Sequence, residues 1–574
     1  MFRFARLTAV LAVTLGAFIA TQAALAAPNC GGKATSGLAA GAGLTPSAVG
    51  KHGGTNAGHV NKLIREVCAE TDSPPTAAAA ALQDAGYEPA EIGEVLVDGF
   101  DQTVLESAEI FAYLGFDATE IAEMLLETYA QTPLEGAQIL KSLGFDAVEV
   151  GTALRDVFSQ TALQSAGILK QVVFDAVEVG TALRDVFAQT AAGAAGILKQ
   201  VAFTAVQVGN ALKTAFLQGA QQAAQILKDI AFGAVDVGLA LKEAFVQTSL
   251  AAAQILKTIA FGVVDVANAL KTAFLEGAQE AAQILKTVLY SAVEVGMALR
   301  DAFLQSAQQA AQVLKNVAFA VVDVANALKT AFLQSAAQAA QVLKTVAFAV
   351  LDVANALKTA FLETAASAAA ILKAILFNPL EVAGALRDAF LQSAAQVAQI
   401  MKTVLYAAAE VANALKEAFL LGAQAAAQLL KDVAYAVGEV ANALKTAFFQ
   451  TAQQVAQILK DIAYAVTEVA NAIKEAFTLA AEAVGEVLQA IGYAVQQVAQ
   501  ALQAAFAMAA EAVGEVLEAI GYTLEQISQA LHDVFGLAED ALKDVLVAIG
   551  FSEDAIDDLF EVLECLLFPP ACFF

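Results

Sequence analysis

Amide side chains recur at one place in a repeated pattern, and they are the residues here best suited to binding. An Asn lies seven residues after an aromatic residue in seven repeats. A side-chain amide both donates and accepts hydrogen bonds, so a row of them would line a repeated polar groove. A repeated array also produces such ladders simply by copying, so a solvated surface is the alternative. The candidate ladder is Asn210, Asn268, Asn326, Asn355, Asn413, Asn442 and Asn471.

Charged residues form further ladders with the same period. An acidic residue recurs four positions after the aromatic residue, as in Glu149, and a basic residue recurs ten positions after it, as in Arg155. A second Lys ladder runs from Lys141 to Lys460. The plain interpretation is that acidic and basic ladders pair with one another on the surface, where each pair contributes roughly 0–1 kcal/mol.

Catalytic chemistry has few candidates. The chain has three His, and two of them, His52 and His59, lie in or beside a Gly-rich segment without the nearby carboxylates or thiols that a metal site needs. No phosphate-binding loop, nucleophile elbow or zinc-protease motif occurs. We therefore expect no enzyme, no cofactor and no metal site.

The elements that position these ladders follow from the period. Seventeen aromatic residues lie 29 residues apart without a slip. They are Tyr87, Phe116, Phe145, Phe174, Phe203, Phe232, Phe261, Tyr290, Phe319, Phe348, Phe377, Tyr406, Tyr435, Tyr464, Tyr493, Tyr522 and Phe551. Such a period indicates a tandem array of small structural units.

The first repeats show how one unit folds. Pro89, after Tyr87 and Glu88, suits the first turn of a helix that runs to about Phe100. Thr132-Pro133 predicts the start of a second helix, and Gly144-Phe145 predicts its end. Each unit is therefore expected to contain two helices of about 11–13 residues.

Both expected helices are amphipathic. In the unit from Phe319, Val324 and Leu328 share one side while Asp323 and Asn326 share the other. One hairpin cannot bury its apolar face, so we expect stacking into an all-α solenoid of about 16–17 two-helix repeats, its hand right-handed or undetermined. The alternative is one unbroken amphipathic helix, because 29 residues make about eight turns at 3.6 residues each.

This pattern resembles the α-solenoid class of helical-hairpin arrays, which includes tetratricopeptide, HEAT, armadillo and mitochondrial terminator-type repeats. The resemblance spans residues 76–562 and concerns architecture only, because the signature residues of those families are absent. In armadillo-type arrays an Asn ladder holds the main chain of an extended peptide, and the Asn residues here are similar in placement. The resemblance therefore implies that this Asn ladder is a candidate peptide-binding ladder.

The two ends differ from the array. Arg3 and Arg6 precede an apolar stretch and Ala24-Leu25-Ala26, so residues 1–26 are expected to be a signal peptide. A Gly-rich leader or cap (27–75) precedes the repeats (76–562), and an apolar cap (563–574) follows them. The four cysteines are confined to these ends, and we favour one disulfide in each cap among the three possible pairings. The candidate disulfides are Cys30–Cys68 and Cys565–Cys572.

Charge limits the partners. The net charge is −27, and the acidic residues are concentrated towards the two ends of the chain. Phosphate binding needs basic surface, so nucleic acid is not expected as a partner. We expect an extracytoplasmic scaffold, secreted, periplasmic or on the cell surface, that binds an unknown protein or peptide or builds a surface or matrix structure. The alternative is a lipid- or membrane-surface-binding amphipathic helical protein.

Overall fold

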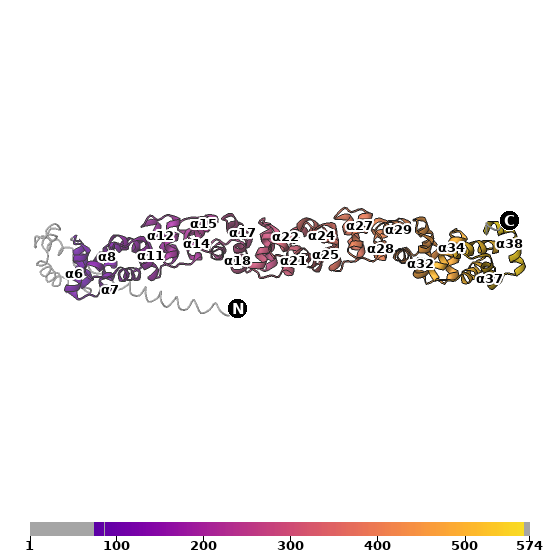
Figure 1. The fold of residues 1–574 in the computed structure, drawn as a ribbon. Coiled ribbons are helices and arrows are strands. Elements are labelled where there is room, and N and C mark those ends of the chain that lie inside the picture. The colour runs from indigo at the N-terminus through magenta and orange to yellow at the C-terminus, as the bar shows by residue number, and fades with distance from the viewer. Residues whose placement is uncertain (1–73, 85, 568–574) are drawn as a thin grey trace, which may run out of the picture. The chain divides into compact units, whose positions relative to one another are not determined.

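The chain is a tandem series of short helices (Figure 1). A computed structural model describes residues 74–84 and 86–567, and across these residues there are 34 helices and no strand. Most of the helices contain ten residues. The expectation of an all-α solenoid is confirmed, and the alternative of one unbroken helix is wrong.

The chain divides into an N-terminal half, which ends at Val288, and a C-terminal half, which begins at Leu289. In each half, first helices, which follow the aromatic residue of a repeat, alternate with second helices. The first helices of the N-terminal half are α6 (Pro89–Phe100), α8 (Ala118–Glu127), α10 (Ala147–Asp156), α12 (Ala176–Asp185), α14 (Ala205–Thr214), α16 (Ala234–Glu243) and α18 (Val263–Ala273). Its second helices are α5 (Pro74–Asp84), α7 (Val104–Tyr113), α9 (Pro133–Ser142), α11 (Ala162–Gln171), α13 (Ala191–Gln200), α15 (Ala220–Asp229), α17 (Ser249–Thr258) and α19 (Ala278–Thr287).

The C-terminal half continues the alternation. Its first helices are α20 (Ala292–Asp301), α22 (Val321–Thr330), α24 (Val350–Ala360), α26 (Pro379–Asp388), α28 (Ala408–Phe419), α30 (Val437–Phe448), α32 (Val466–Phe477), α34 (Val495–Phe506), α36 (Leu524–Phe535) and α38 (Glu553–Leu567). Its second helices are α21 (Ala307–Asn316), α23 (Ala336–Thr345), α25 (Ala365–Ala374), α27 (Ala394–Thr403), α29 (Ala423–Asp432), α31 (Ala452–Asp461), α33 (Ala481–Ala490), α35 (Ala510–Ala519) and α37 (Glu539–Ile549).

Side chains at the helix starts explain where many of the helices begin. At α23, the amide of Gln338 donates to Ser335 Oγ at 3.3 Å, and the amide of Ser335 donates to Gln338 Oε1 at 3.0 Å. This reciprocal pair is a capping box, which satisfies two amides that have no partner inside the helix. Pro89 and Pro133 occupy the first positions of α6 and α9, as predicted.

Both turns of a repeat place one residue in the left-handed region. The predicted helix end at Gly144 is confirmed, with a φ of 97°. In the middle repeats, where the turn glycines are missing, Ala347 takes this place with a φ of 61°, and Phe348 follows it and donates its amide to the carbonyl of Leu343 at 3.0 Å. The turn therefore survives without glycine, because the same backbone hydrogen bonds close it.

Small residues determine how the helix rows pack. Within each half, successive first helices contact one another more extensively than successive second helices do, except at the last pair, α36 and α38. A Cβ added to Gly296 on α20 would lie 3.2 Å from the Cβ of Ala327 on α22, and Ala327 is fully buried. Close approach of the first helices therefore depends on Ala and Gly where they meet. The predicted core positions Val324 and Leu328 are also fully buried.

Candidate binding surface

The Asn ladder lies on the first helices. Its residues are half-buried to exposed, on α14, α18, α22, α24, α28, α30 and α32. Within the part of the chain that the structure describes, none of these seven side-chain amides makes a hydrogen bond. Asn413, Asn442 and Asn471 lie on three successive first helices that pack directly on one another. Each amide therefore presents an unused donor and an unused acceptor at a fixed place in its repeat.

The Lys ladder on the second helices has a structural role that the sequence did not reveal. Lys344 Nζ donates to the carbonyl oxygens of Ile375 at 2.5 Å and Leu376 at 2.8 Å, at the C-terminal end of the next second helix. The same ammonium lies 4.6 Å from the ring centroid of Phe377. The last carbonyls of a helix have no partner within it and carry a partial negative charge, so a cation there stabilises the helix end. We call this contact the lysine staple.

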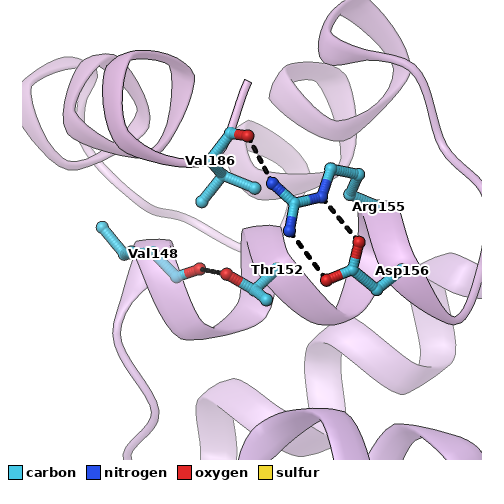
Figure 2. Close-up of polar contacts among 5 residues, drawn as sticks. All are labelled: Val148, Thr152, Arg155, Asp156 and Val186. Atoms are coloured by element: carbon cyan, nitrogen blue, oxygen red, sulfur yellow. Dashed lines mark hydrogen bonds and ion pairs between the residues drawn. The ribbon is translucent and has the colours of Figure 1, made fainter. Parts of the chain in front are cut away.

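The basic ladder on the first helices forms an equivalent contact. Lys329 Nζ donates to the carbonyl of Ala360 at 2.7 Å, at the end of the next first helix. Figure 2 shows the arginine version, in which Arg155 donates to the carbonyl of Val186 and also pairs with Asp156 at 2.6 Å. The hydrogen bond from Arg155 lowers the pKa of the Asp156 carboxyl.

The expectation that acidic and basic ladders pair with one another needs correction. The arginines of the basic ladder pair with the Asp that follows each of them, as in Arg155–Asp156 and Arg387–Asp388. The acidic ladder instead lies at the helix starts. Glu149 Oε2 accepts the amide of Asp146 at 2.7 Å and closes the capping box of α10. Both ladders therefore interact mainly with the ends of helices.

A second exposed row was missed by the sequence reasoning. The residue in the left-handed position of the turn after each first helix is a large apolar residue in nine successive repeats, and its exposed fraction is 77–87%. We call this row the turn ladder. In the N-terminal half it comprises Leu217, Val246 and Leu275, and in the C-terminal half Leu304, Leu333, Leu362, Leu391, Leu420 and Phe449.

The residues of the turn ladder adopt a backbone conformation that is unfavourable for their residue types. A left-handed backbone costs a residue with a Cβ roughly 1–2 kcal/mol, and Gly and Asn tolerate it best. Leu333 adopts a φ of 54° while 81% of it is exposed, so it gains little from burial. The sequence signal was available, because each of these residues lies directly after a Phe and shortly before a helix-capping position.

The outer repeats do not continue the turn ladder. The equivalent turn positions there also have a positive φ, but they hold polar or small residues. They are Asp101, Ala130, Ser159 and Ala188 before the ladder and Thr478, Ala507 and Gly536 after it. A large apolar residue at this position is therefore a feature of the middle repeats, and the turn itself does not require one.

The remaining predicted sites lie mostly at the two ends of the chain. The segments 1–26 and 568–574, and the residues Cys30, Cys68 and Cys572, lie outside the described residues, as do His52 and His59. Cys565 lies in α38, beyond the side chains that the structure describes. In the described part of the chain, no group of three or more His, Cys, Asp or Glu is arranged to hold a metal ion. No helix in that part is both long and apolar enough to cross a membrane.

No family of known proteins matches this sequence, and no curated protein matches it. The architecture is that of an α-solenoid.

Proposed function

We propose that this chain is an extracytoplasmic, non-enzymatic scaffold whose Asn ladder binds an extended polypeptide. The observation that carries the proposal is the set of seven Asn amides that have no hydrogen-bond partner among the described residues. A row of such amides is suited to reading main-chain N–H and C=O groups, which every peptide has. Binding through this row would therefore tolerate many peptide sequences.

The spacing of the ladder suits an extended chain. Neighbouring packed helices lie about 8–10 Å apart, so successive Asn residues are separated by about that distance. An extended chain advances about 3.3–3.6 Å per residue, so about three residues span one repeat. Asn413, Asn442 and Asn471 could then engage every third residue of one bound segment of the peptide.

One gap in the ladder offers a gain-of-function test. Gly384 occupies the Asn position of its repeat, between Asn355 and Asn413. A Cβ at Gly384 would meet no other atom within 4 Å, so Asn fits there without a clash. Gly384→Asn would join two short runs of Asn into one run of six repeats.

The experiment measures fluorescence anisotropy of labelled twelve-residue peptides of varied sequence against the purified protein. Changing Asn413, Asn442 and Asn471 together to Ala removes about three hydrogen-bonding contacts of about 1 kcal/mol each, so the Kd should rise about 100-fold. Gly384→Asn should lower the Kd several-fold.

The matched control replaces three exposed or half-exposed amides on second helices, Gln399, Gln428 and Gln457, with Ala. This variant should bind the peptides as the wild type does. Unchanged binding by the Asn variant, or equal loss in the Gln variant, would reject the Asn ladder as the binding surface.

Binding to a lipid surface is the second candidate function. A long amphipathic helix binds lipid through an apolar face that is free to enter the bilayer interface. The apolar faces of the described helices are instead buried between repeats. The exposed apolar residues of the turn ladder still favour this function. Flotation of the protein with neutral phosphatidylcholine vesicles is the direct test.

A further inference from the structure

One acidic residue occupies a position that the array elsewhere gives to lysine. The residue 25 positions after the aromatic residue is a Lys in twelve successive repeats, from Lys141 to Lys460. The next two repeats have Gln489 and then Glu518 at this position. Since the lysine staple starts from this position, Glu518 puts an anion where the other repeats put the cation that bonds the next second helix.

The carbonyl groups that a lysine would bond are still present beside Glu518. Lys460 Nζ donates to the carbonyls of Ile491 at 2.7 Å and Gly492 at 3.1 Å, and it lies 4.5 Å from the ring centroid of Tyr493. The same offsets from Glu518 lead to Ile549-Gly550-Phe551, again an Ile, a Gly and an aromatic residue. Both turns are closed by the same two backbone hydrogen bonds, at 2.9 and 3.2 Å in the first and at 3.0 and 3.2 Å in the second.

A carboxylate at this position is unfavourable unless a cation accompanies it. Glu518 lies in the last turn of α35, and its position adjoins the last carbonyls of α37. Both helix ends carry a partial negative charge, which favours cations and disfavours anions. Within the part of the chain that the structure describes, no hydrogen bond reaches the Glu518 carboxylate or the carbonyl oxygens of Ile549 and Gly550.

We propose that Glu518 and the turn of Ile549-Gly550-Phe551 form a binding site for a primary alkylammonium group, carried by a lysine side chain or by a free alkyl diamine. An ammonium has three donors, and the two carbonyls and one carboxylate oxygen supply three acceptors. The Glu side chain is one atom shorter than that of Lys, so its carboxylate ends short of the carbonyls and leaves room between them. The ring of Phe551 adds a cation–π contact, as Tyr493 does for Lys460.

The surroundings attract cations. Residues 476–574 carry 16 acidic side chains and one basic side chain, so their net charge is −15. The basic one, Lys543, lies 3.2 Å from Glu539 and 3.4 Å from Asp557, so it is paired away from Glu518. The negative field of these repeats raises the local concentration of a cationic ligand, and the three acceptors select the ammonium.

The experiment measures binding of lysine with both backbone ends blocked to the purified full chain by saturation-transfer difference NMR. This probe carries one ammonium and no other charge, and its Kd should be on the order of millimolar because the site is exposed. Native-state hydrogen exchange then locates the site. The probe at about ten times its Kd should slow exchange of the Gly550 and Phe551 amides about tenfold. The same probe with its side chain acetylated should do neither.

Substitutions at Glu518 separate the ammonium site from the general negative field. Glu518→Lys supplies the ammonium from within the chain, so it should abolish probe binding and slow exchange at Gly550 and Phe551 without any probe. Glu518→Gln removes the charge alone and should raise the Kd about fivefold. The matched control is Glu515→Gln, which removes an exposed charge from the same helix and should change the Kd by less than about twofold.

The proposal fails if the blocked lysine does not bind, if its acetylated form binds equally, or if Glu515→Gln weakens binding as much as Glu518→Gln. It also fails if Ca²⁺ displaces the probe and by itself slows exchange at Gly550 and Phe551, because a metal ion is then the occupant. Tighter binding of 1,5-diaminopentane than of blocked lysine would support the site and identify a free diamine as its ligand, and the reverse order would identify a lysine side chain. The variant with Asn413, Asn442 and Asn471 changed to Ala should bind the probe as the wild type does, so this result is independent of peptide binding by the Asn ladder.

Discussion

The lysine staple predicts how strongly one repeat supports the next, and Lys344→Met measures it. Methionine keeps a long apolar stem but removes the ammonium that bonds Ile375 and Leu376. A hydrogen bond to a charged group contributes about 1.5–3 kcal/mol, and a cation over an aromatic ring about 0.5–1 kcal/mol at an exposed site. The ammonium is half-exposed and the freed carbonyls can be hydrated, so we expect a local loss of about 1–2 kcal/mol.

Native-state hydrogen exchange is the suitable assay, because a repeat array does not unfold in one step. The amides of Leu376 and Phe377 are hydrogen-bonded to Lys373 and Leu372, so they report on the end of α25 directly. A loss of about 1.4 kcal/mol makes their exchange tenfold faster. Amides several repeats away should be unaffected.

Gln341→Met on the same helix is the control. Gln341 is exposed and its side-chain amide reaches only Thr345, at 3.3 Å, so its replacement should change exchange by less than about twofold. Unchanged exchange at Leu376 and Phe377 in Lys344→Met would refute the staple. Equal acceleration by Gln341→Met would show that the effect belongs to α23 and not to the ammonium.

Three further predictions concern the core. Tyr435→Phe should lower the free energy of unfolding by about 1 kcal/mol in chemical denaturation, because its hydroxyl donates to the carbonyl of Tyr406 at 2.7 Å. Tyr464→Phe should leave the free energy of unfolding unchanged or raise it, because that buried hydroxyl has no hydrogen-bond partner among the described residues. Burial, followed by the nearby Glu side chains, raises the pKa of Tyr406 and Tyr435 to about 12 from 10.0, so both favour the neutral form when folded. The stability that this pKa difference contributes is fully present below pH 10 and is lost as the pH rises to about 12. Alkaline unfolding followed by circular dichroism should show this loss, and replacing both tyrosines with Phe should make it smaller. Ala327→Leu should lower the free energy of unfolding by about 1–3 kcal/mol, measured by thermal melting. The reason is that Ala327 packs closely against the backbone at Gly296, where a larger side chain does not fit.

Local signals account for what could be predicted. The 29-residue period, the Pro89 and Thr132-Pro133 helix starts and the Gly144 helix end act over a few residues, so they are visible in a linear sequence. The helices proved shorter than the expected 11–13 residues, most having ten. Each turn uses several residues to close its hydrogen bonds, which left less of the repeat for helix.

The middle repeats were harder to interpret, because their turns lack Gly and Pro. Ala347 and Leu333 have little intrinsic preference for a left-handed backbone, so no local rule predicted a turn at either. Burial of each hairpin against its neighbours provides the free energy that holds those residues there. The exposed turn ladder could therefore be recognised only when the turns were in place.

The sequence by itself determined that the chain is an array of helical hairpins, because a strict period and amphipathic patterning act within each repeat. Tertiary structure decided what the ladders do. Lys344 meets the carbonyls of Ile375 and Leu376 some thirty residues later, and stacking alone brings those atoms together. The same stacking leaves the Asn amides unpaired and the turn leucines exposed, because each repeat covers only the faces that its neighbours reach.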